Sequence, residues 1–156
     1  MKIYLVRHGE AISEDEAGSD RDRWLNTNGR EAVRVLGRLL RETQIEPDAI
    51  VCSPLPRAVQ TAELLAQSLD YLGVIASLRS LEPSAHPGRA ATEIVQAGRA
   101  VIVVGHEPSI SALGAHILGR PSFPPFRTAQ CCFIDNGKPT FMARADIAIV
   151  TAYFVD

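Results

Sequence analysis

The segment Ile3-Tyr4-Leu5-Val6-Arg7-His8-Gly9-Glu10 carries an apolar run that ends directly in an arginine and a histidine. The run predicts a buried first strand over residues 3–6, with Arg7 and His8 at its carboxyl end. In open α/β sheets, ligands bind at the carboxyl ends of strands, and a guanidinium beside an imidazole there is suited to a phosphate. We therefore expect a phosphoryl-binding site at this strand end.

Length and composition are typical of a single soluble domain over residues 1–156. The 156 residues are 46% hydrophobic and 22% charged, which is enough for one core. A formal net charge of −2 predicts no general attraction to nucleic acid or to a membrane. The first apolar run is too short for a signal peptide, and no other run approaches membrane-spanning length. We expect a cytoplasmic protein with no nucleic-acid or membrane partner.

The cysteines and histidines have neither disulfide nor metal-ligand spacing. Cys52, Cys131 and Cys132 include no CxxC pair, and the four histidines are scattered along the chain. Reduced, buried thiols are the expected state of such cysteines. We predict no disulfide and no bound metal, and nothing in the sequence requires a cofactor.

The other apolar periods alternate between strand and helix. Further strands are expected at residues 49–52, 74–78 and 100–105, and the last of these, Ala-Val-Ile-Val-Val-Gly, indicates a central strand buried on both faces. Helices are expected at residues 27–43, with Thr27 as N-cap, and at residues 57–69, 90–97 and 108–119. This alternation favours parallel pairing of the strands.

Two segments depart from the alternation. Residues 131–143, with a turn at Asp135-Asn136-Gly137-Lys138, predict a hairpin at a sheet edge. Residues 10–26 are rich in charge and lack an apolar period, so we expect a loop that faces water. A docking role for this loop is the alternative.

Three predicted strands end in residues of similar chemistry. The ends are Arg7-His8, Ser53-Pro54-Leu55-Pro56-Arg57 and Gly105-His106-Glu107-Pro108, and parallel pairing would bring them together. A phosphoryl group needs cations on its equatorial oxygens and an in-line nucleophile, which two arginines and two histidines provide without a metal. The helix after Pro108 adds N-terminal amides. Each piece alone is weak evidence, whereas the joint pattern predicts a phosphoryl-transfer site.

The same stretches resemble the motifs of the histidine phosphatase superfamily, which includes phosphoglycerate mutases and acid phosphatases. The similar segments occur in the family's order and spacing and lie between residue 3 and about residue 118. They are Leu5-Val6-Arg7-His8-Gly9-Glu10, Leu25-Asn26-Thr27-Asn28-Gly29-Arg30-Glu31-Ala32, Cys52-Ser53-Pro54-Leu55-Pro56-Arg57-Ala58-Val59-Gln60-Thr61-Ala62 and Val104-Gly105-His106-Glu107-Pro108.

The resemblance implies an α/β three-layer sandwich, with a mostly parallel central sheet, helices on both faces and an antiparallel edge. It implies His8 as the nucleophile of a covalent phosphohistidine intermediate, with Arg7, Arg57 and His106 binding the phosphoryl oxygens. The short length and the Leu81-Glu82-Pro83 segment further resemble the small bacterial phosphohistidine phosphatase branch.

Chemistry adds a requirement for His8. A neutral imidazole attacks phosphorus from its unprotonated nitrogen, so the other nitrogen should be held as a donor, plausibly by a nearby backbone carbonyl. The phosphoramidate formed would carry charge that the two guanidiniums offset.

Carboxylates and the remaining histidines are harder to assign. Glu14 stands where many family members carry an asparagine, which counts against a sugar-phosphate mutase. Glu82 is the candidate general acid from its order along the chain, and Glu10 and Glu107 are further candidates. We assign the other two histidines, His86 and His116, to structure or surface.

The sequence therefore predicts a metal-independent phosphatase that removes phosphate from a protein phosphohistidine. The leaving group of such a substrate is an imidazole, which needs a weaker acid than the alkoxide that leaves from an ester. One alternative is a phosphatase of small phosphate esters. Another is a non-catalytic phosphate-binding interaction domain with residues 14–22 as its contact surface, although degenerate members would be expected to have lost His8.

Overall fold

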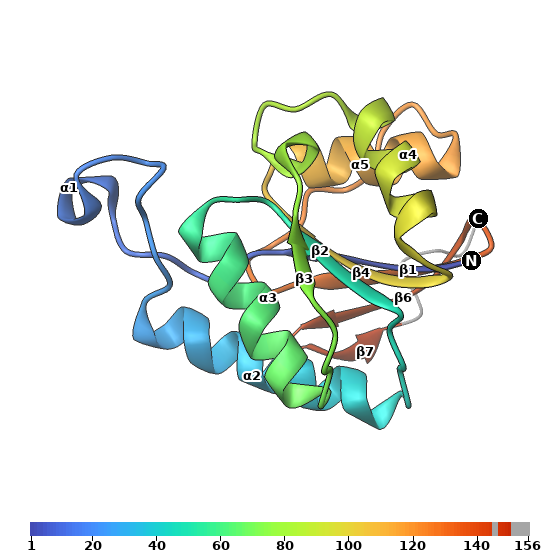
Figure 1. The fold of residues 1–156 in the computed structure, drawn as a ribbon, viewed down its shortest axis with the longest axis horizontal. Helices are drawn as coiled ribbons and strands as arrows, with labels where there is room; N and C mark the ends of the chain where they lie inside the picture. Colours follow the sequence, from blue (N-terminus) through green and yellow to red (C-terminus); the bar gives the residue numbers. More distant parts are fainter. Residues whose placement is uncertain (145–146, 151–156) are drawn as a thin grey trace.

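The computed structural model describes residues 1–144 and 147–150, which form one mixed β-sheet with helices on both faces (Figure 1). The described strands follow the spatial order β3-β2-β4-β1-β5-β6-β7. In chain order they are β1 (Lys2–Arg7), β2 (Ala49–Cys52), β3 (Ile75–Ser77), β4 (Ala100–Gly105), β5 (Cys131–Asp135), β6 (Lys138–Arg144) and β7 (Ile147–Val150).

Strands β3, β2, β4 and β1 pair in parallel, and β5, β6 and β7 extend the sheet antiparallel beyond β1. The register places Arg7 beside Gly105 and Cys52 beside Val104. Strands β1, β2 and β4 therefore end at the same level of the sheet, as the three similar strand ends had predicted.

Helices cover the sheet in two layers. They are α1 (Glu14–Ala17), α2 (Thr27–Glu42), α3 (Pro56–Ser68), the 3₁₀ helix η1 (Arg79–Leu81), α4 (Pro87–Ala97) and α5 (Ser109–Leu118). Helices α2 and α3 pack on one face, and α4 and α5 on the other (Figure 1). The predicted three-layer α/β class is confirmed.

Strand β4 is the centre of the core. Its residues Val101, Ile102, Val103 and Val104 have no exposed surface. Because side chains alternate along a strand, Val101 and Val103 contact the cluster under α4 and α5, whereas Ile102 and Val104 contact the cluster under α2 and α3. This double burial explains why the strand is apolar without alternation.

Local boundaries differ from the sequence prediction at three places. The N-cap of α2 is Asn26 and not Thr27, because the Asn26 side chain accepts a hydrogen bond from the Gly29 amide. Helix α4 begins three residues earlier than predicted, since Pro87 suits its first turn and His86 caps it through Nδ1. The 131–143 hairpin is present as β5 and β6, but β7 lies beyond it and forms the sheet edge.

The three cysteines are free thiols buried in the core. Burial raises the pKa of Cys52 to about 11 and that of Cys132 to about 12, so both remain protonated at neutral pH. Among the described residues, none of the helices is long and apolar enough to cross a membrane.

Candidate active site

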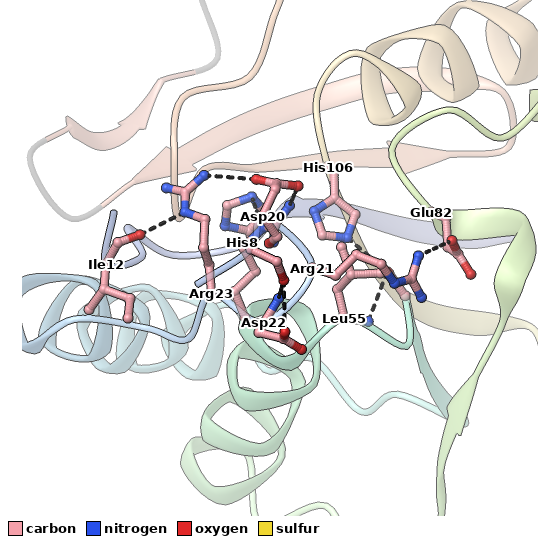
Figure 2. Close-up of polar contacts among 12 residues, drawn as sticks. His8, Ile12, Asp20, Arg21, Asp22, Arg23, Leu55, Glu82 and His106 are labelled. Atoms are coloured by element: carbon pink, nitrogen blue, oxygen red, sulfur yellow. Dashed lines mark hydrogen bonds and ion pairs between the residues drawn. The ribbon is translucent and has the colours of Figure 1, made fainter. Parts of the chain in front are cut away.

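The four residues predicted from the strand ends lie together at the carboxyl edge of the parallel strands. His8 follows β1, Arg57 lies in the first turn of α3, and His106 follows β4. Backbone hydrogen bonds fix the ends of neighbouring strands, from the His8 amide to the Gly105 carbonyl at 3.0 Å and from the Ser53 amide to the Val104 carbonyl at 2.9 Å. The His8 and His106 ring centroids are 4.9 Å apart (Figure 2).

The His8 imidazole is held in one tautomer. Its Nδ1 lies 2.7 Å from the carbonyl oxygen of Gly9. A carbonyl oxygen only accepts hydrogen bonds, so Nδ1 must carry the proton. Nε2 is then the unprotonated nitrogen, and the Arg57 Nε–H group points at it from 3.4 Å. The predicted backbone partner for His8 is therefore present, and Nε2 is the atom available for nucleophilic attack.

The environment also keeps His8 neutral. Burial is the largest cause that lowers its pKa, to about 4, and the charges of Arg57 and Arg7 lower it further. The hydrogen bond to Gly9 opposes this shift but does not cancel it. At neutral pH the imidazole therefore needs no base to expose its lone pair.

The backbone after His8 is fixed by tight packing. The Gly9 amide donates to Thr61 Oγ1 at 3.0 Å, and the Thr61 hydroxyl donates to the Arg57 carbonyl at 2.7 Å. A Cβ added at Gly9 would lie 2.9 Å from both the Gly29 oxygen and a Val33 methyl group, so this position has room only for glycine. Thr61 thus connects Gly9, whose carbonyl orients His8, to the helix that carries Arg57.

His106 is oriented by Ser53. The fully buried Ser53 hydroxyl lies 2.7 Å from His106 Nε2 and accepts a hydrogen bond from the Leu55 amide. We assign the Ser53 hydroxyl as the donor to Nε2, because its hydrogen then has an acceptor. His106 Nδ1 then carries the proton, and among the described residues this buried atom has no hydrogen-bond partner. Burial, followed by the nearby His8 and Arg57, lowers the pKa of His106 to about 3. His106 is thus a neutral donor ready for an oxyanion.

The two arginines are held by backbone oxygens. Arg7 donates from Nη1 to the Phe126 carbonyl at 2.7 Å, and its buried Nε has no partner among the described residues. Arg57 is 4% exposed and donates to both the backbone and the carboxylate of Asp20. Burial lowers the pKa of both guanidiniums, and Glu107 and Asp20 respectively oppose that effect.

A cavity of about 250 Å³ opens over these groups. Its lining is mostly polar and charged and consists of Arg7, His8, Glu10, Ala11, Asp20, Arg23, Arg57, Pro83, His106, Glu107 and Thr128. Within the part of the chain that the structure describes, no cluster of three or more His, Cys, Asp or Glu side chains has an arrangement suited to a metal ion. The cavity suits a small anion bound by guanidinium and imidazole groups.

The candidate carboxylates take different positions. Glu82 lies at the rim, where its Oε2 accepts from Arg21 at 3.0 Å, and the following Pro83 lines the cavity (Figure 2). Glu107 accepts from the Phe126 amide and the Ser111 hydroxyl, so both of its oxygens are engaged.

The outer groups lie farther from the chemistry. Glu10 is exposed and accepts from Asn26 Nδ2 at 2.7 Å. Glu14 is exposed in α1 and is not part of the cavity lining. His86 and His116 are exposed and lie outside the cavity lining, in agreement with a structural or surface role.

The loop over residues 10–26 is closer to the site than the sequence predicted. We expected it to face water, but Asp20 and Arg23 line the cavity and Asp20 contacts Arg57. Ser53 and Thr61 were also missed as positioning residues, although both lie inside the second arginine motif. Each is a hydroxyl residue four positions from Arg57, and this placement within the motif is the sequence signal that could have drawn attention to them.

Comparison with known proteins places the chain in a family. The model of the histidine phosphatase superfamily (branch 1) matches residues 3–82. The chain is 27% identical over 148 residues to the phosphohistidine phosphatase SixA of Escherichia coli (strain K12), which covers 90% of this chain and 91% of that protein.

Solved structures share the fold. The protein histidine phosphatase SixA complexed with tungstate gives a TM-score of 0.86 at 24% identity, over 94% of this chain and 98% of that one. The putative phosphohistidine phosphatase SixA from Agrobacterium tumefaciens gives a TM-score of 0.75 at 24% identity, over 86% and 90%.

These likenesses support a phosphatase. The family match spans more than half of the chain and includes Arg7, His8 and Arg57. The chain therefore belongs to the histidine phosphatase superfamily (branch 1).

Proposed function

We propose that the protein is a metal-independent phosphatase that works through a phosphohistidine on His8 and removes phosphate from a phosphohistidine of another protein. The observation that carries the proposal is the state of the His8 ring. Its Nδ1 is held on the Gly9 carbonyl, and its unprotonated Nε2 faces the cavity floor beside Arg57.

In the first step, His8 Nε2 attacks the phosphorus atom of the substrate. The Nε2–P bond forms as the P–N bond to the substrate imidazole breaks, and the departing imidazole takes a proton from solvent. The equatorial oxygens are bound by Arg7, Arg57 and His106. The charges of the two arginines and the Nδ1–H group of His106 stabilise the transition state.

In the second step, water attacks the phosphorylated His8. The new O–P bond forms while the P–Nε2 bond breaks, and phosphate leaves with the protons of the water shared between its oxygens and solvent. The Gly9 carbonyl keeps Nδ1 protonated throughout, so the ring returns to its starting tautomer.

One feature of the site and one relative support a protein-borne phosphohistidine as the substrate. The imidazole leaving group needs little acid assistance, which agrees with a site whose candidate acids already accept hydrogen bonds, Glu82 from Arg21 and Glu107 from the Ser111 hydroxyl and the Phe126 amide. The relative from Escherichia coli, with which the chain aligns over 90% of its length, is a phosphohistidine phosphatase. We also propose that the protein acts in the cytoplasm and has no nucleic-acid or membrane partner.

The alternative substrate is a small phosphate ester. An alkoxide leaving group needs a proton donor, and Glu82 is placed at the cavity rim where it could serve if Arg21 released it. This second proposal requires Glu82 to be essential for ester hydrolysis. A phosphate-binding domain without turnover is the third, weaker reading, because all four residues of the phosphoryl site are intact.

Mass spectrometry under alkaline conditions tests the mechanism. Wild type, His8→Ala and the exposed control His116→Ala are incubated briefly with a phosphohistidine-bearing protein and, separately, with a generic phosphate ester. We expect a phosphoryl group on His8 in wild type and His116→Ala, faster loss from the phosphohistidine protein, and neither in His8→Ala. Label from the ester alone would favour small-molecule substrates, and absence of label and turnover would favour a binding domain. Activity should survive EDTA.

A further inference from the structure

The Asp20 carboxylate lies between two arginines of the cavity. Its Oδ2 accepts from Arg57 Nη2 at 3.1 Å, and its Oδ1 accepts from Arg23 Nη1 at 3.1 Å. Figure 2 shows Arg23 reaching toward Asp20 from one side. A carboxylate with one oxygen on each guanidinium is bound as a phosphoryl oxygen pair would be.

Asp20 occupies donors that the phosphoryl group needs. Burial alone would raise the pKa of this carboxyl group, but the hydrogen bond from Arg23 and the charge of Arg57 outweigh it, so the pKa is lowered and the group is an anion. A phosphoryl dianion on the same donors would be repelled by it. The two anions therefore compete for this position.

Arg23 is built into the site in spite of its place in a polar loop. Its Nε donates to the Ile12 carbonyl at 2.6 Å, and its side chain is 29% exposed, so the guanidinium is fixed at the cavity wall. Its charge contributes to lowering the pKa of both His8 and Arg7. It therefore acts electrostatically on the same groups that bind and attack the phosphoryl group.

We propose that Arg23 is a third phosphoryl-binding arginine. In this proposal the Asp20 carboxylate accepts hydrogen bonds from Arg23 Nη1 and Arg57 Nη2 until the phosphoryl group of the substrate displaces it. The inference rests on the proposed function for the identity of the anion. It assigns to this loop a direct part in substrate binding.

The loop can remain in place while the Asp20 side chain turns outward. Arg57 Nη1 also donates to the backbone oxygen of Asp20 at 2.6 Å, and Arg21 pairs with Glu82 at the cavity rim at 3.0 Å. Neither contact uses the Asp20 carboxylate, whose side chain is 49% exposed and borders solvent. Displacement therefore needs a side-chain rotation and leaves Arg23 where it is.

Binding of inorganic phosphate, measured by isothermal titration calorimetry at constant ionic strength, tests the proposal without turnover. Asp20→Asn should lower the Kd for phosphate about tenfold, and Arg23→Gln should raise it about tenfold, the size of one charge-assisted hydrogen bond. Asp22→Asn is the matched control. It removes the same charge from the same loop, but Asp22 is exposed and bonds to Ser19, so the Kd should change less than about twofold.

Unchanged or weaker phosphate binding by Asp20→Asn, or an equal gain in Asp22→Asn, would overturn the displacement. Unchanged binding by Arg23→Gln would overturn its role as a ligand. Asp20→Ala, which removes every side-chain contact to the two arginines, is measured beside Asp20→Asn and should lower the Kd at least as much, and circular dichroism verifies the fold of each variant. The His8 labelling experiment is separate, so loss of turnover with the expected binding changes would reject the proposed substrate and leave the anion site standing.

Discussion

The protonation of His8 can be measured directly, and the structure sets its value. Its pKa of about 4, against 6.5 for a free imidazole, corresponds to about 3 kcal/mol that disfavours the imidazolium inside the site. At pH 5 about a tenth of His8 should be protonated, whereas about 97% of an unperturbed histidine would be. The side chain is 6% exposed, so solvent screens this effect little.

The assay is a ¹⁵N–¹H NMR titration of phosphate-free enzyme, with the His8 signals assigned by their loss in His8→Ala. We expect a midpoint near pH 4 and, above it, the proton on Nδ1, because Gly9 accepts from that atom. The exposed His116 provides the comparison for the rate at which a ring N–H proton exchanges with solvent.

Stability should follow the same titration. The unfolded chain binds a proton at His8 below about pH 6.5, while the native site resists it down to about pH 4, so the stability is fully present above pH 6.5 and is lost as the pH falls through this window. Urea unfolding should show a loss of up to about 3 kcal/mol that is smaller in His8→Asn. A midpoint near 6.5, or a proton on Nε2, would refute the reasoning about the nucleophile.

Three further predictions concern other parts of the site and fold. Ser53→Ala removes the donor to His106 Nε2, and we expect turnover of the phosphohistidine protein to fall at least tenfold with a stability loss of about 1–2 kcal/mol. The control Ser109→Ala, whose hydroxyl donates to the His106 carbonyl and not to the ring, should keep turnover close to wild type. Glu82→Gln should leave that turnover within about threefold of wild type, and a tenfold loss with an ester would identify Glu82 as its acid. At Gly29, an alanine Cβ would overlap the backbone of the loop after β1, so thermal unfolding should report a loss of more than about 3 kcal/mol.

The grouping of the candidate site was predictable because its residues lie at or shortly after the ends of apolar strands. Each of the runs before His8, Ser53 and His106 is a strand, and parallel pairing forces their ends to the same edge. A local pattern therefore predicted a contact between residues almost a hundred positions apart. The parallel pairing of the strands and the backbone partner of His8 followed from equally local reasoning, whereas the three layers were implied by the family resemblance.

The contacts of Asp20 and Arg23 were not predictable in this way. Their loop has no apolar period, so nothing in the sequence fixes the direction in which a charged side chain points. The end of the sheet was missed for a similar reason, because β7 follows the hairpin and depends on pairing with β6. Such features are decided by tertiary contacts that no single segment encodes.

The arginines of this site have two effects that support each other. Burial is the main cause that lowers the pKa of His8 and His106, and the arginine charges lower it further, which keeps the proposed nucleophile unprotonated and leaves His106 as a neutral donor. In the proposed mechanism the same charges attract the phosphoryl group. Its negative charge offsets that of the arginines, and this favours protonation of the nitrogen that leaves with the substrate imidazole. Asp20 supplies part of that negative charge before substrate binds, and so compensates the buried guanidinium of Arg57. An internal carboxylate thus stabilises the free site at the expense of affinity, and the balance between the two is set by a side chain that half faces solvent.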